Sequence, residues 1–195
     1  MSVRVGIVSF AHVHSPAYAA VLRGLDTADF VGITDEDPGR GAEAAELFGV
    51  RFFDSVGSLF EEVDAVVVCS ENSNHARDVI PALKGGVHVL CEKPISTTLE
   101  DARAMIRASE TSGSKLRTAF PVRYLPSMVR ARELVRGGAL GRVLAINGTN
   151  HGQNPGGWFL DPELAGGGAV MDHTVHLADV LRITKPDCPR NPPRS

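Results

Sequence analysis

The tripeptide Glu92-Lys93-Pro94 has the residue types that point most directly to chemistry. It follows an apolar run, residues 87–91, typical of a buried strand. A lysine ammonium at the end of such a strand can stabilise a developing alkoxide during hydride transfer, or help to move its proton. Pro94 restricts Lys93 to extended backbone geometry. On composition alone, the alternative is a surface loop with an ordinary Glu–Lys pair.

The turn after the first predicted strand carries Ser9, Ala11 and His14, where a dinucleotide-binding fold usually has the glycines of G-x-G-x-x-G. Ser9 and Ala11 are small enough for a pyrophosphate to approach, whereas His14 is bulky. The sequence leaves open an adapted phosphate loop or a plain strand-to-helix turn. His12-x-His14 could also form half of a metal site, but no carboxylate or Cys lies at ligand spacing nearby, so we predict no metal.

Asp35 stands directly after the second predicted strand. An acidic residue there can accept a hydrogen bond from the adenosine ribose 2′-hydroxyl and repel a 2′-phosphate, which favours NAD over NADP. The alternative is that Asp35-Glu36-Asp37-Pro38 only starts a helix. Both interpretations can hold, because Asp37 suits the N-cap position before Pro38.

Polar residues follow the fourth predicted strand in the run Ser70-Glu71-Asn72-Ser73-Asn74-His75. Side chains at this point would line the nicotinamide half of a cofactor crevice. The alternative is an ordinary helix start capped by Ser73 or Asn74, with His75 as a structural residue of the first turn.

The elements that position these residues alternate between strand and helix. We predict strands at residues 3–8, 30–34, 51–53, 64–69, 87–91 and 116–120, and helices at 15–23, 38–48, 55–60, 74–84 and 98–112, with Ser15 and Thr98 as N-caps. This order is typical of an α/β fold with a doubly wound parallel sheet, a Rossmann domain, in which ligands bind at the carboxyl ends of the strands.

The pattern changes after Phe120, and we place a domain boundary there. Residues 126–136 predict a helix and residues 143–150 a strand; a loop rich in Gly, Asn and Pro follows at 151–157, and a helix begins after residue 168. The predicted organisation is a Rossmann domain at 1–120, the incomplete start of an α+β second domain at 121–183, and a disordered tail at 184–195.

The composition excludes several function classes. The 195 residues carry a net charge of −3 without a basic run, which argues against nucleic acid and anionic membranes as partners. No apolar stretch is long enough to span a bilayer, and the N-terminus lacks the pattern of a signal peptide. Three scattered cysteines do not form a disulfide framework, so we expect a cytoplasmic protein.

These stretches together resemble the Gfo/Idh/MocA family, which includes glucose-fructose oxidoreductase and inositol dehydrogenase. The resemblance rests on residues 64–96 with E-K-P, on residues 123–143, and on residues 166–179, where three glycines precede a D-x-x-x-H pattern. It implies hydride transfer between a nicotinamide cofactor and a hydroxyl of a sugar, polyol or inositol-like substrate. Asp35 makes NAD the expected cofactor, with NADP as the less favoured alternative.

The resemblance also assigns roles to residues. Lys93 matches the catalytic lysine, and Asp172 and His176 match the D-x-x-x-H pair. Residues four apart share one helix face. His176 would take the hydroxyl proton as hydride leaves, and Asp172 would orient that hydroxyl. His173 points about a quarter-turn away, so we assign it no catalytic role.

The remaining candidates surround this group. The candidate cofactor-binding residues are Ser9, Phe10, Ala11, His12, Asp35, Ser70, Asn72, His75, Glu92 and Lys93. Arg123 and Trp158 are candidates for the substrate side, and packing in the core is the alternative for Trp158.

The sequence departs from the family at the glycine-poor first turn and after residue 183. Family members continue into a mostly antiparallel sheet that supports the D-x-x-x-H helix and often mediates oligomerisation. This chain has TKPDCPRNPPRS instead, as a truncated or frameshifted reading frame would produce. Without the sheet, we expect the helix over 168–183 to expose an apolar face at Val170, Leu177, Val180 and Leu181.

Two other functions remain open at this point. One is a non-catalytic dinucleotide-binding or interaction protein that results from the truncation. The other is a metal-dependent lyase or hydrolase that uses His12, His14 and His75.

Overall fold

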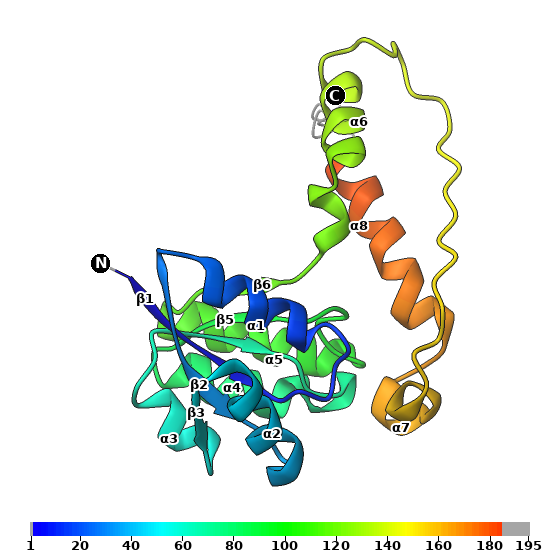
Figure 1. Ribbon diagram of the computed structural model, residues 1–195. Coiled ribbons are helices and arrows are strands. Elements are labelled where there is room, and N and C mark those ends of the chain that lie inside the picture. Colours follow the sequence, from blue (N-terminus) through cyan, green and yellow to red (C-terminus); the bar gives the residue numbers. More distant parts are fainter. Residues whose placement is uncertain (1, 185–195) are drawn as a thin grey trace.

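The computed structural model describes residues 2–184, which form two parts (Figure 1). The first part is a sheet with helices on both faces. The second part rises from the end of this sheet as a pair of helices and a long connecting segment. The predicted disordered tail lies outside the described residues, except for Thr184, which ends the last helix.

The sheet has six strands in the order β3-β2-β1-β4-β5-β6, and every pair is parallel. The strands are β1 (Val3–Val8), β2 (Ala28–Thr34), β3 (Arg51–Phe53), β4 (Ala65–Val68), β5 (His88–Cys91) and β6 (Leu116–Thr118). This is the doubly wound order, so the predicted Rossmann fold is confirmed. The order reverses between β1 and β4, and the ligand crevice of such a sheet lies at their carboxyl ends.

Two apolar layers hold the helices against the sheet. Along β4, Val66 and Val68 face one layer with α3 (Val56–Phe60), α4 (His75–Lys84) and α5 (Leu99–Ser112), while Val67 faces the other with α1 (Ser15–Gly24) and α2 (Pro38–Phe48). Successive side chains of a strand alternate between faces, so a continuous apolar run is buried on both.

Most helix ends follow their predicted caps, but α1 and α4 do not: Asn74 occupies the N-cap position of α4 without a capping hydrogen bond from its side chain. Asp37 accepts hydrogen bonds from the amides of the first turn of α2, and Thr98 caps α5 in the same way. Ser15 does not cap α1, because the helix begins at Ser15 itself and His14 occupies the N-cap position without a side-chain bond. The hydroxyl of Ser15 instead donates to the carbonyl oxygen of His12 at 2.7 Å.

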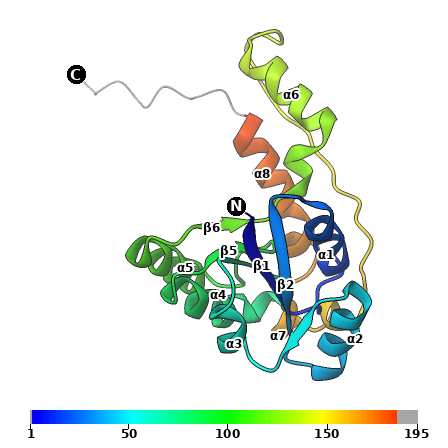
Figure 2. The same ribbon diagram turned by 60° about the vertical axis from the view of Figure 1, so that its left-hand side comes forward.

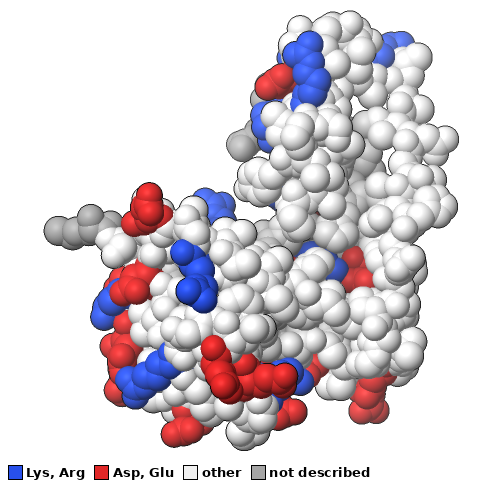
Figure 3. All heavy atoms as spheres, viewed as in Figure 1, with Lys and Arg blue, Asp and Glu red and all other residues white. Residues whose placement is uncertain are grey.

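The second part contains α6 (Pro126–Arg136), the short α7 (Pro162–Ala165), a π-helical turn (Val170–Thr174) and α8 (Val175–Thr184). Helices α6 and α8 pack side by side in both views (Figures 1 and 2). The single helix predicted after residue 168 is therefore a π-turn followed by an α-helix. In the view of Figure 3, charged side chains are frequent over the sheet and its helices. The second part also carries charged side chains at its far end beside α6, and it is largely uncharged along the connecting segment.

The predicted strand at residues 143–150 is wrong. These residues form no strand and pair with no other segment within residues 2–184. An extended segment needs a neighbouring strand for its backbone hydrogen bonds, and none of the described strands is beside it. Leu144 is 80% exposed and Ile146 is 52% exposed, so the apolar residues that suggested a strand are mostly in solvent.

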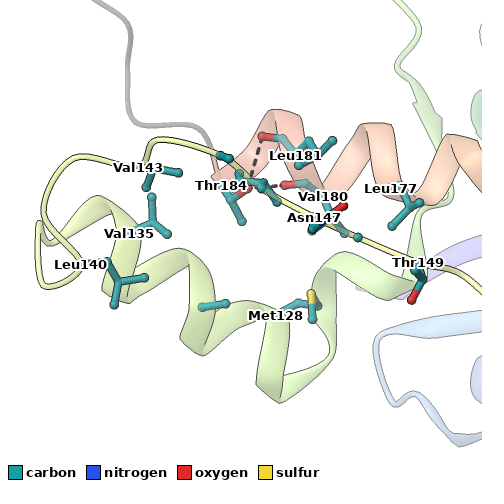
Figure 4. A pocket seen from close by; sticks show the side chains of 14 residues that line it. Met128, Val135, Leu140, Val143, Asn147, Thr149, Leu177, Val180, Leu181 and Thr184 are labelled. Carbon is teal, nitrogen blue, oxygen red and sulfur yellow. Dashed lines mark hydrogen bonds between the residues drawn. The ribbon is translucent and has the colours of Figure 1, made fainter.

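An apolar groove of about 680 Å³ lies between α6, this extended segment and α8 (Figure 4). Met128, Val143 and Leu177 line it from the three segments. The expected apolar face is partly covered as a result: Leu177 is half-buried here, whereas Val170, on the π-turn, is 76% exposed. Within residues 2–184, no helix combines the length and apolar character that a membrane span requires.

Candidate active site

Lys93 and Asp172 form an ion pair that joins the two parts of the chain. Lys93 follows β5 at the carboxyl edge of the sheet, and its Nζ donates a hydrogen bond to the Asp172 carboxylate in the π-turn. The two side chains are 4% and 18% exposed. Burial opposes the charged carboxylate, but the bond and charge from Lys93 outweigh it and hold the pKa of Asp172 below its usual value. The carboxyl group of Asp172 is therefore ionised at neutral pH.

Gly166 allows the π-turn to reach Lys93. Its φ of 74° is in the left-handed region, and a Cβ there would lie 2.2 Å from a side-chain carbon of Thr97. Only glycine accepts both conditions without strain. The turn between α7 and the π-helix can thus pack directly on the segment that follows Glu92-Lys93-Pro94.

His176 lies one helical turn after Asp172 and is 9% exposed. Its ring meets Phe120 edge-on, with 6.2 Å between the ring centroids. Burial lowers the pKa of His176 below 6.5, and the positive charge of Lys93 lowers it further. The Nδ1 atom has no hydrogen-bond partner among residues 2–184. A neutral imidazole with a free ring nitrogen can accept a proton from a hydroxyl.

Glu92 is fully buried and forms the centre of a hydrogen-bond network. Its carboxylate accepts from the hydroxyl of Tyr18 at 2.6 Å and from the backbone amide of Lys93 at 2.8 Å, and it lies 2.9 Å from Nδ1 of His14. Burial opposes ionisation, but the bonds from His14 and Tyr18 outweigh it and lower the pKa of Glu92 to about 2. The network fixes the backbone from which Lys93 projects.

The first turn is held by bonds within the chain. The amide of Phe10 donates to Asp35 at 2.6 Å, the amide of Ala11 to Ser9 Oγ at 3.1 Å, and the amide of His12 to the carbonyl of Cys69 at 3.0 Å. Ser9 has a φ of 69°, a conformation that glycine adopts without strain. A pyrophosphate at this turn would compete with these bonds.

Asp35 lies at the end of β2, as predicted, but both of its oxygens already have partners. Arg40 donates to them at 2.6 and 3.0 Å, and the amides of Phe10 and Asp37 donate as well. The side chain of Asp35 is completely buried. Arg40 is not among the predicted site residues; its place in the first turn of α2 indicates that it is near Asp35, but not that the two side chains form an ion pair.

A cavity of about 300 Å³ lies beside Asp35 and is predominantly acidic. Glu36, Asp54 and Asp78 line it, together with one cation, Arg77. Arg77 bridges to Glu36 at 2.7 Å. The cavity therefore has a negative balance of charge where the adenosine end of a dinucleotide binds in this fold.

A second cavity, of about 170 Å³, lies beside Asp172. Asn72 lines it, and its Nδ2 donates to the carbonyl of Ala165 at 2.9 Å, while its Oδ1 has no partner among the described residues. His173 also lines it, 3.6 Å from Asp172. No catalytic role is predicted for His173 from the sequence, yet this residue forms part of the wall of the cavity.

The structure places the other candidates as follows. His75 is fully buried, with ring nitrogens 2.9 Å from the carbonyl of Pro94 and 3.2 Å from that of Ser70, which suits the structural role considered for it. Ser70 is buried, and its hydroxyl has no partner within residues 2–184. These residues line the carboxyl ends of β4 and β5.

Arg123 and Trp158 form hydrogen bonds with residues other than Lys93 and Asp172. Arg123 forms a two-point ion pair with Asp179 of α8. The indole of Trp158 donates to the carbonyl of Ala11 at 2.9 Å and stacks on Phe159. Arg123 therefore anchors α8, and Trp158 packs on the first turn.

Comparison with known proteins gives matches along nearly the whole chain. Residues 3–120 match a family described as an oxidoreductase family with an NAD-binding Rossmann fold, and residues 128–185 match the GFO/IDH/MocA C-terminal domain. A 1,5-anhydro-D-fructose reductase of Ensifer adhaerens is 39% identical over 158 residues, which are 77% of this chain and 47% of the relative.

Two further matches also cover most of this chain and about half of the other protein. A myo-inositol 2-dehydrogenase of Thermotoga maritima is 32% identical over 92% of this chain and 54% of its own. The crystal structure of an NAD-binding protein from Listeria innocua superposes with a TM-score of 0.79 at 26% identity, over 93% of this chain and 54% of that one. The chain spans about half the length of the curated relatives that it matches.

Proposed function

Because the chain belongs to the Gfo/Idh/MocA family of oxidoreductases, we propose that it transfers a hydride between NAD and a hydroxyl-bearing carbon of a sugar, polyol or inositol-like substrate. The family resemblance inferred from the motifs is thereby confirmed. One observation carries the proposal: the buried Lys93–Asp172 ion pair lies at the carboxyl edge of the sheet, with the neutral His176 one turn further along.

His176, Lys93 and Asp172 have different roles in the transfer of the hydroxyl proton. His176 accepts the proton of the substrate hydroxyl at its free Nδ1, because its lowered pKa keeps the ring neutral. The ammonium of Lys93 stabilises the negative charge that develops on the substrate oxygen. Asp172 keeps Lys93 in place and orients the hydroxyl. NAD, when bound, supplies the carbon that accepts the hydride.

Residues at the carboxyl ends of β2 and β4 fit the two ends of a dinucleotide, whereas the first turn would exchange its internal hydrogen bonds for bonds to the pyrophosphate. The hydroxyl of Ser70 and Oδ1 of Asn72 are buried without partners at the point where the strand order reverses, so they can bond a ligand there. The acidic cavity beside Asp35 disfavours the 2′-phosphate of NADP and suits the free ribose of NAD. Asp35 would share its oxygens between that ribose and Arg40.

We further propose that residues 1–120 bind the cofactor and residues 121–183 supply the substrate side. The second part contributes Asp172 and His176, and its cavity beside Asp172 has room for part of a small polyol. Asn72 and His173 offer polar contacts there. Neighbouring hydroxyl groups of a sugar or inositol are suitable partners for them.

The test has two steps on the 195-residue chain. NADH and NADPH are titrated while nicotinamide fluorescence is followed; then inositols, sugars and polyols are screened with NAD for the absorbance of NADH. We expect NADH to bind more tightly and at least one polyol to be oxidised. Lys93→Ala should abolish turnover, while the exposed Lys84→Ala should leave it unchanged.

Each outcome has a distinct meaning. Failure of both nucleotides to bind would refute the proposal. Tight NADH binding without turnover of any substrate would favour a dinucleotide-binding protein that is not an enzyme. Turnover that survives Lys93→Ala would remove Lys93 from the mechanism.

A further inference from the structure

Three side chains that can bind a metal ion meet below the first turn. His12 and His14 come from that turn, and Glu92 comes from the end of β5, 78 residues after His14. Nδ1 of His14 lies 2.9 Å from one Glu92 oxygen, and Nε2 of His12 lies 4.0 Å from the other. The fold thus supplies the carboxylate that the sequence around His12-x-His14 lacks.

The set of donors is a recognised one. Two imidazoles and one carboxylate are the protein ligands of many catalytic zinc sites, which leave a fourth position open. One ligand atom from each residue lies within 4.8 Å of the others. Tetrahedral zinc holds its ligand atoms about 3.3 Å apart, so shifts of about 1 Å would bring the three together.

His12 gives an independent sign of a ligand. Its ring is 1% exposed, and its Nε2 has no hydrogen-bond partner among residues 2–184. Buried polar atoms almost always have a hydrogen-bond partner, so a buried nitrogen without one is consistent with a ligand that binds there. It is directed to the same side as the Glu92 carboxylate.

The surroundings already orient the carboxylate. Tyr18 donates to one oxygen of Glu92 at 2.6 Å, and the amide of Lys93 donates to the other at 2.8 Å. Such outer hydrogen bonds hold ligands in place in known metal sites.

Metal binding would have a definite local cost. The backbone amide of His14 donates to Nδ1 of His12 at 3.1 Å, so Nε2 carries the ring hydrogen in the metal-free chain. A metal bound at Nε2 requires the ring hydrogen to be on Nδ1, so the hydrogen bond from the His14 amide to Nδ1 is lost. One neutral hydrogen bond contributes far less than binding of an ion by several protein ligands. The His14 side chain is 40% exposed and offers the way in from solvent.

We propose that His12, His14 and Glu92 bind a divalent transition-metal ion of the zinc type. The ion would link the first turn to the Glu92-Lys93 segment. This structural role is separate from the proposed hydride transfer. The first turn lacks the glycines that usually shape a phosphate-binding turn. The bound ion would instead fix the positions of this turn and of the Glu92-Lys93 segment.

The test is a metal titration of the untagged 195-residue chain after treatment with a chelator. Co²⁺ is added while visible absorption is followed, and Zn²⁺ is then used to displace it. We expect one Co²⁺ per chain, with the absorption of a low-coordinate site, and complete displacement by Zn²⁺. His14→Ala and Glu92→Gln should each weaken binding about 100-fold or more, and Tyr18→Phe about 10-fold.

His151→Ala is the matched control, because His151 is an exposed histidine outside the cluster. It should leave the affinity unchanged. Circular dichroism checks the fold of each variant, and the half-exposed His14→Ala decides if Glu92→Gln does not fold. Absence of stoichiometric Co²⁺ binding would overturn the proposal, and so would binding by His14→Ala as tight as that of the parent.

Discussion

The ammonium of Lys93, at the end of β5, donates a hydrogen bond to the carboxylate of Asp172, 79 residues later in the chain. This single contact ties the sheet to the π-turn that also leads to His176. Because both side chains are largely buried, neither charge has water as an adequate substitute partner.

Replacement of Asp172 by Asn should therefore destabilise the chain. It leaves the Lys93 ammonium buried without a counter-charge, and we expect the free energy of unfolding to fall by about 3 kcal/mol. Urea denaturation measures this. Glu62→Gln is the matched control, because its ion pair with Arg51 is exposed and should contribute less than about 1 kcal/mol. Equal effects of the two variants would contradict the buried pair.

The pKa of His176 gives a second prediction. Burial, and then the charge of Lys93, lowers this pKa below 6.5, although the negative charges of Asp172 and Glu92 partly offset the effect. We expect the base to stay active below pH 6.5 in the direction of substrate oxidation. The unfolded chain binds the proton more readily, so this histidine should also cost stability as the pH falls below about 6.5.

Titration of the histidine ring protons by NMR measures the pKa directly, with His176→Asn to assign the signal. Lys93→Met removes the positive charge and should raise the pKa of His176. A value at or above 6.5 in the parent chain would show that the ring is not buried as described.

The left-handed conformation of Ser9 predicts an order of stability. Ser9→Gly and Ser9→Ala both lose the bond from the Ala11 amide to the hydroxyl, so that loss cancels in their comparison. Alanine retains the strain of a positive φ, and glycine does not. Ser9→Ala should therefore be less stable than Ser9→Gly by about 1 kcal/mol. Thermal and urea unfolding measure this difference. If Ser9 had an ordinary φ, Ser9→Gly would be the less stable variant, because glycine loses more conformational freedom on folding.

Asp35 should control the choice between cofactors. Asp35→Ala removes a hydrogen-bond acceptor for the ribose and a charge that repels a 2′-phosphate, so we expect the preference for NADH over NADPH to fall about 10-fold. The ratio of the two dissociation constants is the quantity to measure. Asp26→Ala, an exposed replacement away from this edge, should leave the ratio unchanged. An unaltered ratio in Asp35→Ala would mean that Asp35 serves only to hold Arg40.

The local pattern of the sequence predicts most of the sheet and its helices. Apolar runs such as residues 64–69 and caps such as Asp37 act over a few residues, so periodicity and turn chemistry find them. Residues 143–150 show the limit of this method. Their pattern suits a strand, but a strand also needs a neighbour, which no local pattern can supply.

In the site, too, the sequence predicts local features but not contacts between distant residues. Sheet topology places Lys93 at the ligand-binding edge, but its pairing with Asp172 depends on a contact over 79 positions, and only the family resemblance indicated it. The approach of Glu92 to His14 spans 78 positions, a separation that no local pattern of the sequence indicates. Arg40 is close to Asp35 in sequence, yet its rotamer, and not its spacing, decides that the two form an ion pair.

The position of Trp158 has a practical consequence. It is the one tryptophan in the chain, and its indole is bonded to Ala11 in the first turn. All tryptophan emission therefore originates beside the turn where a dinucleotide would approach. The absorption of reduced nicotinamide overlaps this emission, so energy transfer from a single donor can report occupancy of the crevice. The chain carries its own optical probe, and cofactor binding can be followed without a label.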